Sequence, residues 1–481
     1  MNRIYFIFLF LIFSGAVHGQ TAKKRMNFIY YITDDIGRND VGAFGNKVIK
    51  TPNIDELAQE GLLFQNGYVA TSSCSPSRCS MISGRYPHNT GAPELHNPLP
   101  PDQFMFPQLL NEAGYYTVLS GKNHMGPHVK NAFDTISLGV GPGAQEDWTW
   151  FIRNRPKEKP FFFWFGSHDA HRPWQFDDKG TIYDPDDIQV PPMLYDGPVT
   201  REDLAGYYHE ISRADYYLGE LVKELKKEGI LNSTYIIFLS DNGRPFPRCK
   251  TRLYDSGDKV PLIIYGPDVK VGDTDALVSA IDIAPTVLDL AGVKQDRRIQ
   301  GKSFSEVLLG KANSVRDFLF AEHNWHIYKN HERMVRFGDW MYIRNAYPER
   351  QVLAGESTRV FPAGKELWEA HDRNLTKPQQ EDVFLVPRPA EELYNVKDDP
   401  FQFNNVADVK ENAETLDYLR NVLDQWIVQT GDSKPSNPTP DKERVSGKAL
   451  KGFKRGEKPG ESKNATSINH SGPVNKNDTA F

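Results

Sequence analysis

A cysteine near the start of a short predicted helix is the residue best suited to nucleophilic chemistry in this sequence. Pro76 and Ser77 favour the start of a helix, and Gly84 favours its end. Cys74 therefore just precedes the helix, where exposed N–H groups and the helix dipole favour an anion and would lower the pKa of the thiol. Arg78 lies one turn further on and is able to reach back toward Cys74. The competing interpretation is a small cysteine buried at a helix start.

Polar residues that could bind ligands follow three predicted strands. Each strand is a run of apolar residues that favour β-structure, and the three runs are Asn27–Thr33, Phe161–Gly166 and Tyr235–Ser240. The polar residues that follow them are Asp34-Asp35, His168–His171 and Asp241-Asn242. Since ligands gather at the carboxyl ends of the strands in open parallel sheets, we expect these residues to form one site. Taken singly, a pair of aspartates after a strand is as readily a loop or a helix cap.

The order of strands and helices predicts an α/β fold. Strands that are apolar on both faces alternate with amphipathic helices, which is typical of a mostly parallel sheet covered on both sides. Further strands are expected at Tyr116–Ser120, Val260–Tyr265 and Ala276–Ala280, and helices at Ile54–Leu63, Phe106–Ala113, Arg201–Glu228 and Pro285–Leu290. A smaller α+β domain is expected to contain a hairpin at Arg333–Phe337 and Trp340–Arg344, a strand at Glu391–Val396 and a helix at Ala413–Thr430.

Local composition divides the chain into four predicted segments. The apolar run Ile4–Phe13 is too short to cross a bilayer and has the layout of a secretory signal peptide, which would span residues 1–19. A catalytic domain is expected at residues 25–316 and the smaller domain at residues 317–430. Residues 431–481 contain almost no large apolar side chains, so a disordered tail is expected there. The mature protein is therefore expected to be secreted or periplasmic, without stable insertion into a membrane.

The composition of the whole chain excludes several classes of protein. The 481 residues are 39% hydrophobic, which is enough to build a core and excludes a wholly disordered chain. The formal net charge of −6 gives no long-range attraction for nucleic acid or anionic lipid, so neither is expected as a partner. Only three cysteines are present, which excludes a scaffold held together by disulfides.

The segment Cys74-Ser75-Pro76-Ser77-Arg78 resembles the Cys-x-Pro-Ser-Arg signature of the type I, formylglycine-dependent sulfatases. Other segments resemble further motifs of that family in the same order, namely Asp34-Asp35, Gly121–His124, His168–His171, Ser240–Gly243 with Lys250, and Glu391–Pro400. The resemblance implies an alkaline-phosphatase-like fold and the activity of a sulfuric ester hydrolase. It also implies that a formylglycine-generating or equivalent maturation enzyme converts Cys74 to 3-oxoalanine (formylglycine), whose hydrated aldehyde is the nucleophile.

The resemblance also assigns roles to the residues of these motifs. Arg78 and Lys122 are expected to hold the hydrated aldehyde and to screen negative charge. His124 is expected to be the base that regenerates the aldehyde. His171 and Lys250 are expected to bind the sulfate and to protonate the leaving atom. A cluster of cations suits this reaction, because sulfate transfer concentrates negative charge on the sulfate oxygens.

A divalent cation is expected at the same site. By resemblance, its ligands are Asp34, Asp35, Asp241, Asn242 and the modified Cys74. Carboxylate and amide oxygens suit a hard cation, so Ca²⁺ is expected rather than zinc. Such a cation would lower the pKa of a bound hydroxyl group and neutralise the sulfate.

The motifs are most similar to those of the sulfamidases, the N-sulfoglucosamine sulfohydrolases, on the carbohydrate side of the family. This likeness implies a substrate among sulfated polysaccharides or their oligosaccharide fragments. We expect cleavage of an O-sulfate ester, and the alternative is the sulfamate of heparan-type chains. Aromatic and cationic side chains suit sugar faces and anionic groups. The candidates for sugar contacts are His96, Arg172, Arg244 and His323, followed by His88, Trp174, Arg248, Trp325 and His326, and each is as readily an ordinary surface residue.

Two other classes of function remain open at this point. A phosphodiesterase or phosphatase of the same superfamily would have a Thr or Ser nucleophile and Asp and His ligands for two zinc ions, which Cys74 and the oxygen ligands argue against. A non-enzymatic glycan-binding protein is the interpretation that applies if Cys74 stays a thiol. Cys79 and Cys249 are expected to be two free thiols, with a disulfide between them as the alternative.

Overall fold

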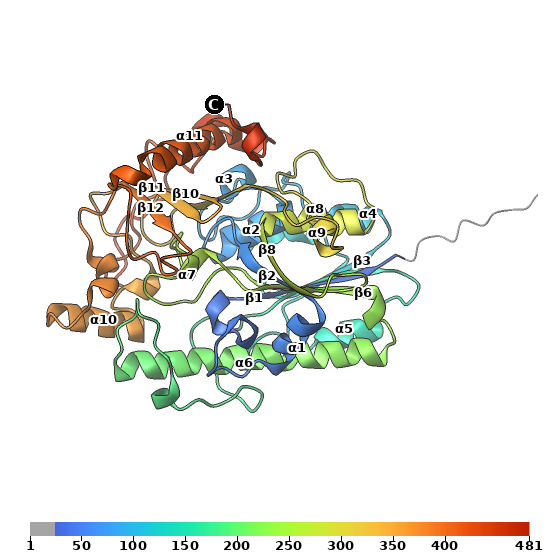
Figure 1. Cartoon of the computed structure of the whole chain (residues 1–481). Coiled ribbons are helices and arrows are strands. Elements are labelled where there is room, and N and C mark those ends of the chain that lie inside the picture. The colour runs from blue at the N-terminus through green and yellow to red at the C-terminus, as the bar shows by residue number, and fades with distance from the viewer. Residues whose placement is uncertain (1–24, 481) are drawn as a thin grey trace, which may run out of the picture.

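The computed structural model describes residues 25–480, so the predicted signal peptide lies outside the described residues. Within this range a mixed, mostly parallel sheet runs in the strand order β4-β3-β5-β1-β6-β7-β2-β8 (Figure 1). Its strands are β1 (Asn27–Thr33), β2 (Leu62–Tyr68), β3 (Tyr116–Gly121), β4 (Thr135–Ser137), β5 (Phe161–Gly166), β6 (Thr234–Ser240), β7 (Leu262–Tyr265) and β8 (Gly272–Ser279). Only β7 is antiparallel to its neighbours among these strands.

Strand β1 lies at the centre of this sheet and positions the predicted site. All of its residues are buried, because helices cover both faces of the sheet. It pairs in parallel with β5 on one side and β6 on the other, so the three strands end at the same edge. Backbone hydrogen bonds extend the pairing beyond the strands, from Asp34 N to Asp169 O at 2.7 Å and from Asp241 N to Thr33 O at 3.1 Å. The polar residues that follow the three strands are therefore neighbours.

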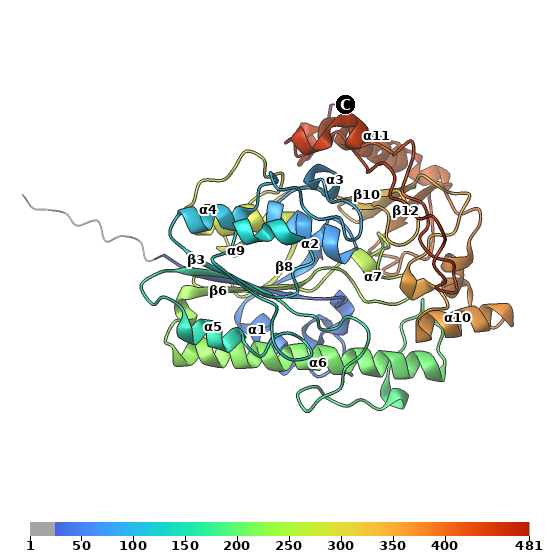
Figure 2. The ribbon, with the colours of Figure 1, turned by 180° about the vertical axis from the view of Figure 1, so that it is seen from behind.

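Two layers of helices cover the large sheet (Figures 1 and 2). One layer packs into a buried apolar cluster with α1 (Pro52–Glu60), α5 (Trp148–Asn154) and α6 (Pro198–Lys227). The opposite layer packs into a second cluster with α2 (Cys74–Ser83), α4 (Phe106–Glu112), α8 (Ile283–Leu290) and α9 (Ser305–Leu308). The short helices α3 (Pro87–Thr90) and α7 (Asp255–Asp258) lie in connecting segments. Because both faces are buried, the strands of this sheet are apolar on both sides.

A second sheet follows in the chain. It is antiparallel, with the order β12 (Glu391–Asn395), β11 (Trp340–Asn345), β10 (Glu332–Phe337) and β9 (Phe318–His323). Helices α10 (Pro362–Asp372) and α11 (Ala413–Thr430) belong to the same part of the chain. Trp426 of α11 stacks on Phe320 of β9 with ring centroids 5.1 Å apart, so this helix is packed on the sheet. The predicted fold class, a mostly parallel sheet with helices and a smaller α+β unit, is confirmed.

The prediction of a disordered tail was wrong for the described part of that segment. Residues 431–480 lie against the body of the protein, and Val474, although it is in this segment, is 9% exposed. The buried guanidinium group of Arg85 donates to the backbone oxygens of Thr466 and Ile468 at 3.1 and 2.9 Å. Trp325 Nε1 donates to Pro440 O at 2.7 Å. The low apolar content of this segment predicted disorder. Polar residues in the rest of the protein hold the segment in place, and such contacts cannot be recognised from composition.

Among the described residues, no helix combines the length and the apolar character needed to cross a bilayer.

Candidate active site

Four side chains that could bind a cation meet at the carboxyl edge of the large sheet. Asp34 and Asp35 follow β1, Asp241 follows β6, and Cys74 is the first residue of α2. One potential ligand atom from each lies within 4.8 Å of the others, and all four side chains are buried. Asn242 joins them, because its Nδ2 donates to Asp35 Oδ1 at 2.6 Å. The structure thus brings together the five residues that the sequence predicted as metal ligands, which we call the acidic cluster.

Each carboxylate of the acidic cluster pairs with a different buried cation. The pairs are Lys122 with Asp34, Lys250 with Asp35 at 2.7 Å, and Arg78 with Asp241 at 2.7 Å. Arg78 Nη1 also donates to the backbone oxygen of Lys122 at 3.1 Å. Since buried ions are held in place by their partners, the three cations form a fixed positive surface beside Cys74. The predicted cationic residues of the site therefore lie where they would face an anion bound there.

The acidic cluster fits a hard cation. Asp34 Oδ1 and Asn242 Oδ1 are buried oxygen atoms without a hydrogen-bond partner. Burial raises the pKa of Asp35 to about 7, with Asp34 and Asp241 adding to the rise and Lys250 opposing it. A bound cation would satisfy the unpartnered oxygens and relieve the repulsion among the carboxylates. The donor set consists of oxygens and the atom at position 74, which suits Ca²⁺ better than zinc.

Cys74 differs from its sequence-based prediction in one respect. It begins α2 instead of preceding it, and Ser73 occupies the N-cap position. The helix start was expected to lower the pKa of the thiol, but burial raises that pKa, with Lys122 and Lys250 opposing the rise and the neighbouring aspartates adding to it. Cys74 Sγ lies 3.9 Å from Asp35 Oδ1. An unmodified thiol at this position is therefore protonated near neutral pH and is a weak nucleophile.

Three histidines lie around Cys74. His124 Nε2 lies 2.7 Å from His96 Nδ1, and His124 Nδ1 is buried without a partner. Burial, with the positive charge of Lys122, lowers the pKa of His124 to about 2, so the ring is neutral and can accept a proton. His171 is exposed, and its Nδ1 donates to the backbone oxygen of Arg172 at 2.6 Å. In a neutral His171 ring this leaves Nε2 as an acceptor.

The four predicted sugar-contact residues have different surroundings. His96 is exposed beside His124, as a contact residue would need to be. Both Nη atoms of Arg172 pair with the carboxylate of Asp203, and the residue lines a cavity with His171, so its role as a sugar contact stays a prediction. His323 is 1% exposed and its Nδ1 lies 2.9 Å from Glu332 Oε2, so it is not the surface residue that was expected.

Arg244, the fourth of these residues, lies outside the acidic cluster. It is bound to Asp40 at 2.8 Å and lines a separate cavity.

Sequence reasoning missed one residue of the site and ranked another too low. Glu356 Oε1 lies 3.9 Å from Lys250 Nζ. Glu356 belongs to the part of the chain that contains the second sheet, and no motif in the sequence points to it. His326, a secondary candidate for sugar contact, is buried with its Nδ1 2.7 Å from Ser73 Oγ, directly before Cys74. Long-range packing of the second sheet against the first brings both residues to the site.

Cys79 and Cys249 are both free thiols, as expected. Cys79 belongs to the apolar cluster on one face of the large sheet and Cys249 to the cluster on the other face. The sheet therefore separates the two sulfur atoms.

Two family models match the chain. Residues 26–146 and 144–293 match the model described as Sulfatase. Residues 249–342 match the model described as N-sulphoglucosamine sulphohydrolase, C-terminal.

Several curated proteins are similar over most of their length. N-sulphoglucosamine sulphohydrolase of Homo sapiens is 29% identical over 471 residues, covering 86% of this chain and 92% of that protein. An ulvan-active sulfatase of Formosa agariphila is 28% identical over 465 residues, covering 85% of this chain and 76% of that protein. N-acetylglucosamine-6-O-sulfatase of Bacteroides thetaiotaomicron is 25% identical over 525 residues, covering 86% of this chain and 88% of that protein.

Solved structures share the fold. A protein in complex with its substrate D-glucosamine-2-N,6-O-disulfate superposes with a TM-score of 0.66 at 21% identity, covering 84% of this chain and 98% of that one. A complex with a neocarrahexaose superposes with a TM-score of 0.63 at 23% identity, covering 84% of this chain and 93% of that one.

Proposed function

The chain belongs to the sulfatase family and is a sulfuric ester hydrolase, and on this premise we propose that it removes sulfate groups from sulfated polysaccharides or their oligosaccharide fragments. We propose an O-sulfate ester as the bond that it cleaves and formylglycine, formed from Cys74, as its nucleophile. The observation that carries the proposal is the position of Cys74 at the start of α2, among three buried cations and an acidic cluster.

The state of the Cys74 thiol supports conversion to formylglycine. Burial keeps this thiol protonated, so the unmodified residue is a poor nucleophile. The hydrated aldehyde of formylglycine supplies a hydroxyl nucleophile whose reactivity does not depend on a thiolate. The enzyme therefore needs a maturation partner that oxidises Cys74 before it becomes active.

The cations around Cys74 would bind the sulfate and stabilise its developing charge. Lys122 and Arg78 are held by Asp34 and Asp241, so they face position 74 without reorganisation when the substrate binds. The charges of Lys250 and His171 both act to lower the pKa of Asp34, which supports a role for the two residues at this site. We assign sulfate binding to this pair and protonation of the leaving oxygen to Lys250, because the neutral His171 ring uses its one N–H for Arg172 O.

His124 would move a proton at position 74. Burial keeps the ring neutral, and its Nδ1 has no hydrogen-bond partner among the described residues. The hydrogen bond between its Nε2 and His96 Nδ1 holds the orientation of the ring. A neutral imidazole with a free nitrogen is able to accept a proton from a hydroxyl group at position 74.

Asp34, Asp35, Asp241, Asn242 and the residue at position 74 would hold a Ca²⁺ ion. When bound, the ion supplies positive charge that lowers the pKa of a coordinated hydroxyl and offsets the charge of the sulfate. Calcium is plentiful outside the cytoplasm, which agrees with the signal peptide expected at residues 1–19. We therefore propose that the enzyme is secreted or periplasmic.

Hydrolysis of a sulfamate is the second candidate function. The C-terminal match at residues 249–342 and the 29% identity to human N-sulphoglucosamine sulphohydrolase favour it. The ulvan-active and N-acetylglucosamine-6-O-sulfatase relatives favour an O-sulfate ester. Both reactions use the same sulfate-binding residues and differ in the leaving atom, nitrogen or oxygen.

Release of inorganic sulfate from paired saccharides tests the proposal. The matured protein is incubated with glucosamine oligosaccharides that carry only a 6-O-sulfate, only an N-sulfate, or other single O-sulfates such as those of ulvan. We expect release from at least one O-sulfated compound. Release from the N-sulfated compound alone would establish the sulfamidase alternative. No release from any compound by protein whose Cys74 is converted, as shown by mass spectrometry, would refute the proposed function.

A further inference from the structure

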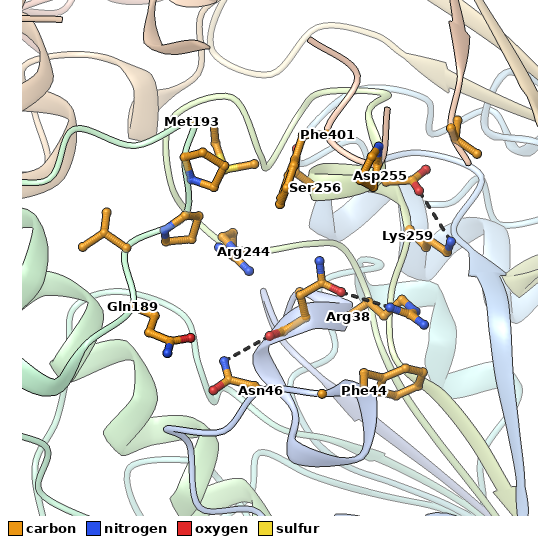
Figure 3. A pocket seen from close by; sticks show the side chains of 18 of the residues that line it. Arg38, Phe44, Asn46, Gln189, Met193, Arg244, Asp255, Ser256, Lys259 and Phe401 are labelled. Atoms are coloured by element: carbon orange, nitrogen blue, oxygen red, sulfur yellow. Dashed lines mark hydrogen bonds and ion pairs between the residues drawn. The ribbon is translucent and has the colours of Figure 1, made fainter. Parts of the chain in front are cut away.

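A second cavity lies at the carboxyl edge of the large sheet, apart from the acidic cluster. It encloses about 490 Å³, within the range of sites for small ligands. The segments that line it are Gly37–Asn39, Phe44–Asn46, Gln189–Met193, Tyr208, Arg244, Asp255-Ser256, Lys259, Val396 and Pro400-Phe401 (Figure 3). None of the residues of the acidic cluster lines it. The cavity is therefore a site distinct from the proposed active centre.

Three cations surround this cavity, which we call the basic cavity. Arg38, Arg244 and Lys259 line it, and Figure 3 shows them around the open space. Two carboxylates form ion pairs with these three cations. Asp40 pairs with Arg244 at 2.8 Å, and Asp255 lies 3.5 Å from Lys259. Burial lowers the pKa of Lys259; Asp255 opposes this effect, and the positive charges of Arg38 and Arg336 add to it. Positive charge is thus in excess within the basic cavity.

The arginines of the basic cavity have donors without acceptors. Arg244 is 6% exposed, yet its Nε and Nη1 atoms are buried and have no hydrogen-bond partner within residues 25–480. Arg38 Nε is a third buried guanidinium nitrogen for which the described residues supply no acceptor. Buried guanidinium groups in proteins are normally paired, because an unsatisfied buried donor is costly. These donors therefore indicate an oxyanion as the missing partner.

The rest of the wall of the basic cavity combines apolar and aromatic side chains with polar ones, among them Asp255 and Ser256. Phe44 and Phe401 line it together with the segment Pro191–Met193, and Figure 3 shows Met193 and Phe401 along one edge. Asn46 and Gln189 add amide groups that can bind hydroxyls. Cations, amides and aromatic faces in one cavity are the combination that binds a charged sugar ring. An inorganic anion would use the cations and leave the apolar wall without a partner.

The basic cavity is linked to the acidic cluster through two short connections. Arg244 follows Asn242 by two residues, and Gly37 follows Asp35 by two residues. Tyr207 joins the two sites, because its hydroxyl lies 2.9 Å from both Asp35 O and Asp40 Oδ2. A saccharide chain bound at the active centre and a sugar unit in the basic cavity would therefore occupy neighbouring parts of one edge of the sheet.

We propose that the basic cavity binds one sulfated sugar unit of the polysaccharide without cleaving it. The sulfate lies against Arg38, Arg244 and Lys259, and the ring lies against Phe44, Phe401 and Met193. This inference rests on the proposed function for its choice of ligand, and it adds a second site for the same class of substrate. The enzyme thereby recognises a chain that carries more than one sulfate.

Calorimetric titration of the Cys74→Ala variant tests this proposal. That variant cannot form the nucleophile, so the probe, 6-O-sulfated N-acetylglucosamine, is not consumed. Two binding events are expected, one at each site. Substituting Arg38 or Lys259 by Met in this background is expected to weaken one event about tenfold or more, since each removes a charge-assisted contact. Unchanged affinity and stoichiometry in both variants would overturn the proposal.

Lys47→Met is the matched control. Lys47 is exposed, directly follows the cavity-lining residue Asn46 in the chain and does not itself line the basic cavity. Its substitution by Met therefore removes one positive charge without changing the site. We expect the Lys47→Met variant to leave both binding events unchanged. If it weakened binding as much as Arg38→Met or Lys259→Met does, the loss of affinity would be an effect of net charge and not of contacts in the basic cavity. Arg244 is tested as Arg244→Met with Asp40→Asn, because the single change would leave Asp40 buried without its partner. Thermal unfolding confirms that each variant is folded.

Two further probes identify the ligand. Inorganic sulfate is expected to bind the basic cavity at least tenfold more weakly than the sulfated sugar, and unsulfated N-acetylglucosamine more weakly still. Equal affinity for inorganic sulfate would overturn the sugar assignment. Failure here is separate from failure of the proposed function, because sulfate release by the unsubstituted, matured protein does not depend on the number of binding events.

Discussion

At the scale of single residues, the proposed active centre is a balance of buried charges. Three carboxylates meet three cations, and each cation is fixed by one carboxylate. Such pairs gain little stability, because desolvation offsets most of the Coulomb energy. What they provide is a set of positive groups already in place before an anion arrives, which is the arrangement that stabilises developing negative charge.

Replacing Lys250 by Met tests this role. Lys250 Nζ lies 2.7 Å from Asp35 Oδ1 and is buried, so its charge is held at the site. We expect kcat/KM for a sulfated saccharide to fall about 10²–10³-fold, the loss typical of one such electrostatic group. Lys226→Met, at an exposed position of α6, is the control and should leave kcat/KM unchanged. A Lys250→Met enzyme that is folded and fully active would contradict the assignment.

Removal of divalent cations tests the acidic cluster. Without a cation, the buried carboxylates of Asp34, Asp35 and Asp241 repel one another, and this repulsion adds to the effect of burial in raising the pKa of Asp35. We expect a chelator to lower the melting temperature and abolish sulfate release, and Ca²⁺ to restore both. At a free concentration of about 100 times the Kd, binding adds about 2.7 kcal/mol. Asp241→Asn should show a smaller shift, and an identical shift would exclude this cluster as the site.

At the scale of elements, strands determine which residues meet. β1 lies between β5 and β6, so residues more than two hundred positions apart become neighbours. The sequence predicted this site because the apolar strands and the polar residues after them are local signals. The chemistry at Asp34, Asp35 and Asp241 could therefore be located before the fold was known.

Other elements could not be predicted, for physical reasons. The segment Leu62–Tyr68 forms β2, although helical spacing suggested that a helix continued to Leu63. Helix α1 ends at Glu60 because Gly61 leaves the helical conformation, with φ −123° and ψ −161°. The contact of Glu356 with Lys250 depends on the docking of the second sheet, which no local pattern reports. Sequence patterns predict local structure and strand ends, whereas contacts between distant loops depend on packing.

Deleting residues 434–481 tests the C-terminal segment. The truncation retains Asp432, whose carboxylate pairs with Arg333 at 2.5 Å. It removes three acceptors of the fully buried Arg85, on Thr466, Ile468 and Asn469, and leaves those on Asn89 and Arg298. We expect the free energy of unfolding to fall by about 3 kcal/mol, the cost of a few unsatisfied buried donors. An unchanged urea midpoint would show that these contacts do not form.

At the scale of the whole molecule, buried ion pairs link stability to pH. In the short 3-10 helix Pro378–Phe384, burial raises the pKa of Asp382, but Arg252, Arg388 and Arg248 outweigh this effect and hold the pKa at about 2. Burial also raises the pKa of Glu332, and Arg252 and His323 likewise bring it to about 2. Both carboxyl groups are thus ionised in the folded protein at pH values where the unfolded chain is protonated.

Acid therefore destabilises the protein through these groups. Because the folded pKa values are lowered, their contribution is present above about pH 4 and is lost as the pH falls toward 2. We expect each group to account for about 2 kcal/mol of the loss, measured by urea unfolding between pH 6 and pH 2.5. Asp382→Asn should be less stable at pH 6 and lose less stability on acidification. An equally steep decline in this variant would contradict the charge pairing.

The measurement that tests the account most directly is the rate of sulfate release by matured protein and by Cys74→Ala on the same O-sulfated oligosaccharide. We predict release by the first protein, in which Cys74 is converted to formylglycine, and no release above background by the second. Equal rates from the two folded proteins would show that position 74 is not the nucleophile, and the mechanism proposed for this family member would be refuted.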